Sequence, residues 1–167
     1  KAPLRNDVEF TQNGRYVSAV YDVVKYDFDT LSGEIASISI RDKKIADYFK
    51  FNIFKAPLDN DRVDVNSWIE NKFNFARSEV RKYSIENGVL TFCGDIVGVQ
   101  VCPIVSYQLT YRFLITGVEV ELNYTLNDNF PTLPRIGLYA KLPNTYNMIE
   151  YLGYEGETYS DMHHSAD

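Results

Sequence analysis

Alternating apolar and polar residues recur along this chain of 167 residues, and this period of two predicts β-strands. The clearest case is a pair of arms in which every second residue is apolar. These residues are Val105, Tyr107, Leu109, Tyr111 and Phe113 in the first arm, and Val118, Val120, Leu122, Tyr124 and Leu126 in the second. Only Leu114 to Gly117 separates the arms, so the pattern predicts an antiparallel hairpin with one apolar face.

Shorter alternating segments predict the rest of an all-β fold. Residues 16–28 and 34–40 are expected to form an earlier hairpin that turns at residues 31–33. Further strands are expected at residues 47–56, 88–96, 98–104 and 135–142. We therefore predict an antiparallel β-sandwich, with residues 1–167 forming a single domain.

One stretch departs from this period and predicts a single helix at about residues 67–82. Its apolar residues fall at helical spacing: Trp68, Ile69, Phe73, Ala76 and Val80. Ser67 followed by Glu70 matches a capping box at the start of a helix. We expect Trp68 to pack in the core rather than to hold a sugar, because its neighbours Ile69 and Phe73 share the apolar stripe.

Composition and charge narrow the range of partners. A hydrophobic fraction of 45% and an aromatic fraction of 14% are enough for a folded core. With 17 basic and 23 acidic residues the net charge is -6, and we predict no nucleic-acid partner because phosphate binding needs clustered Lys and Arg. The sequence has no run of about 18 apolar residues, so we also predict no membrane partner.

Two cysteines leave two pairing states open. If Val97-Gly98 is a two-residue hairpin loop, Cys93 and Cys102 face each other across the strands and a disulfide becomes possible. Two buried free thiols are the state we favour, since nothing in the chain indicates an oxidising compartment. Two cysteines without a nearby histidine do not predict a zinc site.

The segment Phe54-Lys-Ala-Pro-Leu-Asp-Asn-Asp-Arg62 is not explained by strand or helix patterning. Pro57 favours an extended backbone before it, and the Asp and Asn residues after it bond readily to nearby backbone groups in turns. Residues 151–161 form a second loop rich in glycine, aromatic residues and carboxylates. Two further segments have distinctive patterns. Residues 26–34 combine an aromatic-Asp pair with a Ser-Gly hairpin turn, and residues 134–138 read Pro-Arg-Ile-Gly-Leu at the entry to a predicted strand.

In this order, these segments resemble the small-chain, C-terminal β domain of glycoside hydrolase family 2 β-galactosidases. The resemblance spans most of residues 20–161. Residues 153–162 depart from the family pattern: they lack its proline, are one residue shorter and have Met162 in place of its arginine.

The resemblance implies a large two-sheet supersandwich like that of galactose mutarotases, of which residues 1–167 would be the N-terminal part. It also implies that the catalytic glutamates belong to a separate (β/α)₈ barrel domain of the same protein. That barrel domain is therefore the expected partner, with a galactoside as a further one. We expect no catalytic residue, no metal and no cofactor in this chain, and an exposed sheet edge is expected to favour a homo-oligomer.

The chain's own carboxylates do not by themselves indicate a catalytic pair, although both of their segments are turn-like and so leave convergence open. A retaining glycosidase needs two carboxylates about 5–5.5 Å apart, but alternate residues such as Asp59 and Asp61, or Glu155 and Glu157, point to opposite faces of an extended chain. Adjacent His163 and His164, near Asp161 and Asp167, indicate a solvated tail rather than a metal site.

Seven residues are candidates for contact with a carbohydrate or with a neighbouring domain. They are Asp59, Asn60, Asp61, Tyr154, Glu157, Tyr159 and Asp161. An equally supported alternative is that they only satisfy the loop backbone and dock onto that domain. The main hypothesis is a non-catalytic β-galactosidase domain, and the alternative is a stand-alone carbohydrate-binding or interaction module. An aldose-epimerase-like enzyme is disfavoured because it needs a His and Glu pair and the chain has only two histidines.

Overall fold

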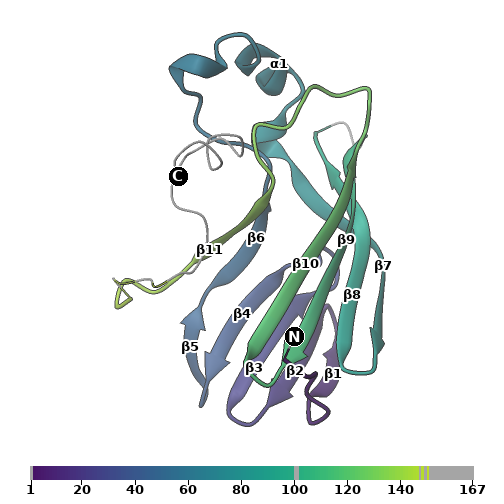
Figure 1. Ribbon diagram of the computed structural model, residues 1–167, viewed down its shortest axis with the longest axis vertical. Helices are drawn as coiled ribbons and strands as arrows, with labels where there is room; N and C mark the ends of the chain where they lie inside the picture. The colour runs from purple at the N-terminus through teal and green to yellow at the C-terminus, as the bar shows by residue number, and fades with distance from the viewer. Residues whose placement is uncertain (1, 100–101, 147, 149, 151–167) are drawn as a thin grey trace, which may run out of the picture.

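The computed structural model describes residues 2–99, 102–146, 148 and 150, which form two antiparallel β-sheets packed face to face (Figure 1). This arrangement confirms the predicted all-β sandwich. No helix in the described part of the chain is both long and apolar enough to cross a membrane.

The smaller sheet has four strands in the order β10-β9-β8-β7. Their bounds are Arg77–Glu86 for β7, Val89–Val97 for β8, Pro103–Leu114 for β9 and Gly117–Leu126 for β10. The hairpin of β9 and β10 is confirmed, with Leu114 opposite Gly117 and Val105 opposite Leu126. The apolar residues of β9 face the second sheet and are buried.

The larger sheet follows the path β1-β2-β3-β4-β6-β11, with β5 paired to the side of β4. Its strands are β1 (Glu9–Asn13), β2 (Tyr16–Tyr21), β3 (Val24–Asp29), β4 (Ile35–Ile40), β5 (Lys43–Ala46), β6 (Tyr48–Asn52) and β11 (Gly137–Lys141).

The early hairpin is only partly as predicted. The turn at residues 31–33 joins β3 to β4, as expected. Residues 16–28 are not one arm, however, because Asp22 adopts a positive φ of 49° and turns the chain between β2 and β3. Asp and Asn are the residues other than glycine that tolerate this left-handed conformation best, and the alternating pattern alone does not reveal the turn.

Aromatic side chains from both sheets fill the core. Phe28 of β3 lies with its ring centre 4.7 Å from that of Tyr111 of β9. The buried hydroxyls also join the sheets, since Tyr111 donates to the Gly33 carbonyl and Tyr107 donates to the Ser32 carbonyl, each at 3.2 Å. Within the described residues, every buried side-chain nitrogen and oxygen has a hydrogen-bond partner.

The predicted helix at residues 67–82 exists but is much shorter. Helix α1 spans Val65–Glu70, and a 3₁₀ turn at Phe73–Phe75 follows after Lys72, whose φ is 60°. The capping box is wrong, because the helix begins before Ser67. Residues 77–86 form β7, since their ladder with β8 outweighs the helical spacing of Ala76 and Val80.

Trp68 is buried, as predicted, and its indole N–H donates to the Thr132 carbonyl at 2.9 Å. This bond ties α1 to the segment between β10 and β11. The apolar body of the indole packs with Phe73 in the core while its polar edge is satisfied. The side chain therefore serves packing.

The cysteine register differs from the hairpin assumption. Cys93 lies opposite Gln108 in the ladder of β8 and β9, and β8 ends at Val97 while β9 begins only at Pro103. The connecting segment is thus longer than two residues, and Cys102 does not reach the position facing Cys93. The expectation of facing sulfurs is wrong. The favoured state of two buried free thiols is confirmed only in part, because both thiols are free but Cys93 is half-buried and Cys102 is exposed.

Candidate functional site

The candidate turn lies between β6 and α1, where Asp59–Asp61 forms a single 3₁₀ turn. Two reciprocal bonds close it. The Asp61 amide donates to the Leu58 carbonyl at 3.0 Å, and the Leu58 amide donates to Asp61 Oδ2 at 2.7 Å. Pro57 precedes this turn and has no amide hydrogen to compete for the same acceptors. The local sequence therefore specifies the turn, as its Asp and Asn content predicted.

Asp61 anchors the turn to the rest of the loop. Its other oxygen, Oδ1, lies 3.0 Å from the ammonium nitrogen of Lys55, and its side chain is only 12% exposed. The Leu58 amide bond, with the Lys55 ammonium, holds the pKa of the Asp61 carboxyl below its usual range. Asp61 is therefore an ionised structural anchor at neutral pH.

Asp59 and Asn60 have the opposite environment. Both are exposed, and the Asp59 side chain is 93% accessible, with an ion pair to Arg62 at 3.3 Å. Asp59 thus pairs with an exposed arginine, whereas Asp61 binds the Leu58 amide and Lys55 within the loop. Asp59 and Asn60 are the members of the turn that remain accessible to another molecule.

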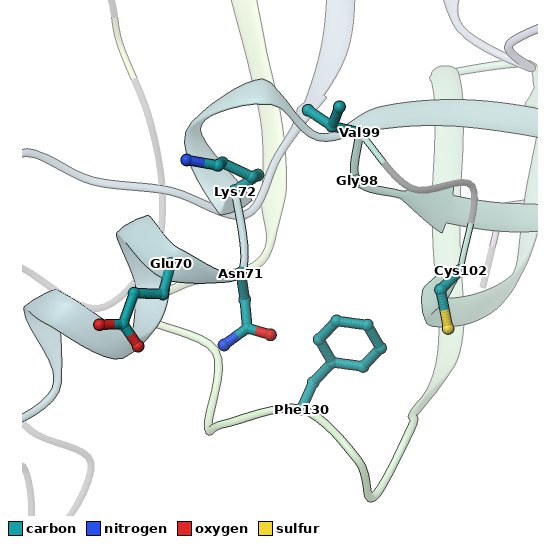
Figure 2. A pocket seen from close by; sticks show the side chains of 7 residues that line it. All are labelled: Glu70, Asn71, Lys72, Gly98, Val99, Cys102 and Phe130. Atoms are coloured by element: carbon teal, nitrogen blue, oxygen red, sulfur yellow. The ribbon is translucent and has the colours of Figure 1, made fainter.

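A small hollow beside α1 is shown in Figure 2. Its volume is about 150 Å³, and its lining residues are Glu70, Asn71, Lys72, Gly98, Val99, Cys102 and Phe130. The Asn71 amide is already committed to the helix, since it donates to the Ser67 carbonyl at 2.8 Å. Ligand sites in proteins are usually about 300–1,000 Å³, so this hollow is too small to enclose a sugar.

A second hollow, of about 250 Å³, adjoins the candidate loop through Phe54. Tyr139, which is 43% exposed, and the buried Phe73 add aromatic rings to its lining, and Asn52 and Asn74 add amides. The Asn52 side-chain oxygen accepts from the Phe54 amide at 3.0 Å and so fixes the local backbone. At about 250 Å³ this hollow is also below the usual volume of a ligand site, so it could contact part of a sugar but not enclose it.

We define Phe54, Phe73, Tyr139, Asn52 and Asn74 as the aromatic-amide hollow. The sequence reasoning missed it, because its members come from β6, the loop after β6, the 3₁₀ turn after α1, and β11. The one local signal was an asparagine, Asn52, close to the aromatic residues Phe51 and Phe54.

The remaining predicted contacts cannot be placed in this site. Tyr154, Glu157, Tyr159 and Asp161 lie outside the described residues, as do Glu155 and both histidines. Of the seven predicted contact residues, the structure therefore brings together Asp59, Asn60 and Asp61 alone. Across the part of the chain that the structure describes, no group of three or more His, Cys, Asp or Glu side chains could hold a metal ion.

Known proteins similar to this chain share one description. A family model described as "Beta galactosidase small chain" matches residues 21–167. A protein of Actinobacillus pleuropneumoniae named "Beta-galactosidase" is 32% identical over 151 residues, which cover 85% of this chain and 15% of that protein. A protein of the same name from Kluyveromyces lactis is 26% identical over 160 residues, covering 88% and 16% respectively. The chain thus spans about 15% of the length of the first of these curated relatives.

Proposed function

The chain belongs to the β-galactosidase small-chain family, and from this premise we propose that it is a non-catalytic domain of a larger enzyme that hydrolyses terminal β-D-galactosides. The family match over residues 21–167 carries this proposal. The relatives named "Beta-galactosidase" are several times longer than this chain, which leaves room for a catalytic barrel domain elsewhere in the polypeptide. That barrel is the proposed partner, and no cofactor is required from this chain.

The carboxylates of the candidate turn support a non-catalytic role. A glycosidase acid needs a raised pKa so that it stays protonated until it donates. Asp61 has a lowered pKa, with its two oxygens committed to Leu58 and Lys55. Asp59 is exposed to water and pairs with Arg62. Neither residue has the environment of a catalytic acid.

We assign the candidate turn a place at the wall of the active-site cleft of the larger enzyme. Asp61 and Lys55 hold the turn in shape, so that Asp59 and Asn60 are presented outward. The aromatic-amide hollow, which adjoins the same loop through Phe54, offers the 43% exposed ring of Tyr139 and amide groups of the kind that contact a sugar. The role is to shape the cleft and to contact the carbohydrate or the adjoining domain.

The alternative function is a stand-alone carbohydrate-binding or interaction module, and the aromatic-amide hollow is the observation that favours it. Calorimetric titration of the 167-residue chain with galactose separates the two proposals. The non-catalytic domain gives no saturable heat. Saturable millimolar or tighter binding that is lost in Tyr139→Ala would favour the module instead.

Two enzyme assays test the main proposal. The isolated chain is expected to give no turnover of a chromogenic β-galactoside above the blank. In a full-length protein that carries this chain, Asp61→Asn should lower kcat/KM by about tenfold or more, because a loosened turn misplaces the cleft wall. Asp64→Asn is the matched control, since Asp64 is exposed and its side chain makes no cap bond to α1.

These assays have clear contrary outcomes. Turnover by the isolated chain would refute the non-catalytic role. Equal kcat/KM values for Asp61→Asn and Asp64→Asn in the full-length protein would show that the turn does not form part of the cleft wall.

A further inference from the structure

The turn between β3 and β4 is bound to the smaller sheet by buried hydroxyls. The Ser32 carbonyl accepts from the Ser78 hydroxyl of β7 at 2.6 Å and from the Tyr107 hydroxyl of β9 at 3.2 Å. The next carbonyl, that of Gly33, accepts from the Tyr111 hydroxyl of β9 at 3.2 Å. All three donor side chains are buried, where hydrogen bonds are stronger than in water. The position of this turn is therefore fixed by the opposite sheet.

Strand β6 has a very short ladder with β4. In the described part of the chain, Ile35 opposite Phe49 is their one residue pair. Continuing that register would place Gly33 opposite Phe51, but Gly33 has a φ of 71° and belongs to the turn. The Phe51 amide donates instead to Oε1 of Glu34 at 3.0 Å. The Glu34 side chain thus replaces a missing backbone acceptor of the ladder.

The environment of Phe51 makes this acceptor important. Phe51 is only 9% exposed, and its ring centre lies 4.8 Å from that of Tyr107 in the opposite sheet. A buried amide without an acceptor destabilises the folded state, so the backbone would have to move to find another partner. The bond to Glu34 therefore holds this end of β6 in place.

Strand β6 runs on towards the loop that precedes α1 (Figure 1). Directly after Phe51, the Asn52 side chain accepts from the Phe54 amide, and both residues line the aromatic-amide hollow. The next residue, Lys55, lies 3.0 Å from the Asp61 carboxylate that closes the candidate turn. Few residues thus separate the Glu34 bond from the hollow and the turn, so a shift of β6 would move both.

We propose that Glu34 is a positioning residue for the candidate turn and the aromatic-amide hollow. It connects the end of β6 to the bound turn between β3 and β4, and so transmits the position of the smaller sheet to the loop after β6. Glu34 acts through the Phe51 amide rather than on a substrate. This inference rests on the proposed function, since the position of the turn affects the reaction only if the turn forms part of the cleft wall.

This role needs an acceptor oxygen rather than a charge. Burial raises the pKa of the Glu34 carboxyl, so its environment does not favour the ionised form. Glutamine offers an acceptor oxygen at the same distance along the side chain, whereas alanine offers none. Glu34→Gln and Glu34→Ala are therefore a matched pair, in which only the second removes the acceptor.

Hydrogen exchange of the 167-residue chain, followed by NMR, tests the positioning directly. In Glu34→Ala, the Phe51 and Leu58 amides should exchange at least about tenfold faster, relative to the amides of the β8–β9 ladder. Glu34→Gln should keep both rates within about threefold of the wild type. If Glu34→Ala does not fold, Glu34→Asp takes its place with the same expectation, because its carboxylate is one methylene short.

Val17→Ala is the control for a general loss of stability. Val17 is fully buried in β2 and belongs to neither the bound turn nor β6, so its truncation destabilises the core without touching these contacts. The exchange of the β8–β9 ladder should become faster in this variant, with no selective effect on Phe51 or Leu58.

Activity of a full-length protein that carries this chain tests the consequence for the reaction. Glu34→Ala should lower kcat/KM by about tenfold or more, because the cleft wall is misplaced. Glu34→Gln and Val17→Ala should stay within about twofold of the wild type. Rescue by glutamine separates positioning through the Phe51 bond from a general effect of substitution.

Three results would overturn the inference. The first is unchanged exchange of the Phe51 and Leu58 amides in Glu34→Ala. The second is an equal effect of Glu34→Gln and Glu34→Ala, which would mean that the acceptor oxygen is not what matters. The third is a wild-type kcat/KM for Glu34→Ala while Asp61→Asn is impaired. If Asp61→Asn also retains full activity, the proposed cleft wall fails, and the exchange rates alone decide whether Glu34 positions the turn.

Discussion

At the scale of single residues, Glu34 is the clearest case of a side chain whose environment changes its chemistry. It lies directly after the turn between β3 and β4, and its Oε1 accepts from the Phe51 amide of β6 at 3.0 Å. Burial of the carboxyl raises its pKa, and the Phe51 amide opposes this only in part. Glu34 therefore links the turn before β4 to β6, and ionisation of its buried carboxyl costs free energy in the native state.

This cost predicts a pH dependence. Because its pKa is raised, the Glu34 carboxyl in the native protein keeps a proton at pH values where it has lost that proton in the unfolded chain. The contribution of Glu34 to the stability therefore falls as the pH rises above about 4.5, towards and through its native pKa. Glu34→Gln keeps an oxygen for the Phe51 amide but carries no charge, so its free energy of unfolding should lack this decline.

Urea unfolding between pH 4 and pH 8 measures the difference. Glu70→Gln, which removes the same charge at an exposed position, should follow the wild-type profile. Parallel pH profiles for wild type and Glu34→Gln would show that the burial of Glu34 has no energetic effect.

At the scale of elements, the bulge in β7 and a glycine in β8 depend on each other. The ladder shifts between Val80 and Lys82, and Gly94 of β8 lies opposite Val80. A Cβ atom built on Gly94 would lie 2.3 Å from the Glu79 carbonyl oxygen, closer than any real contact allows. The β7 backbone can lie this close to β8 because Gly94 has no side chain.

We predict that Gly94→Ala is destabilising by about 1–3 kcal/mol, because the β7 backbone must move away from the new methyl group. Gly137→Ala is the matched control, since a Cβ atom there meets no atom within 4 Å and its cost should be below about 0.5 kcal/mol. Chemical unfolding gives both values. Equal effects of the two substitutions would mean that the close approach at Gly94 carries no cost.

The strands also show where prediction from the local sequence pattern is right and where it is wrong. The hairpin of β9 and β10 was predicted correctly, because its ten apolar residues alternate on both arms and the loop between them is short. Residues 77–82 were assigned wrongly to a helix, because Ala76 and Val80 fit both periods and only pairing with β8 decides between them.

At the scale of the whole molecule, a cluster of rings joins the two sheets. Phe28 is fully buried and lies against Tyr111 and Phe113 of the opposite sheet, with ring centres 4.7 and 6.3 Å away. Tilted and edge-on ring pairs such as these stabilise a core beyond the area they bury. The sandwich therefore depends on a few large side chains near its centre.

Phe28→Ala should cost about 3–5 kcal/mol, since it removes the ring and leaves a cavity between the sheets. A cost of this size is a large part of the stability of a domain, so the variant is expected to melt far earlier or to remain unfolded. Phe75→Ala, at a residue that is 63% exposed, should change the stability by about 0.5 kcal/mol or less. Thermal melts of both variants check this, and a small loss for Phe28→Ala would place the centre of the core elsewhere.

The amino-acid sequence by itself determined the fold class, the β9–β10 hairpin and the burial of Trp68. It also determined the turn at Asp59–Asp61, because turn chemistry acts over three or four residues. Periodicity and turn preference are local properties, and each can be evaluated without knowing which strands will meet.

Only the tertiary structure decided which of these local options are used. It ended α1 early in favour of β7, separated Cys93 from Cys102, and joined β6, β11 and the turn after α1 into the aromatic-amide hollow. The physical reason is that pairing between strands distant in sequence sets register and neighbours, and the free energy of those long-range contacts outweighs the preferences of a short segment.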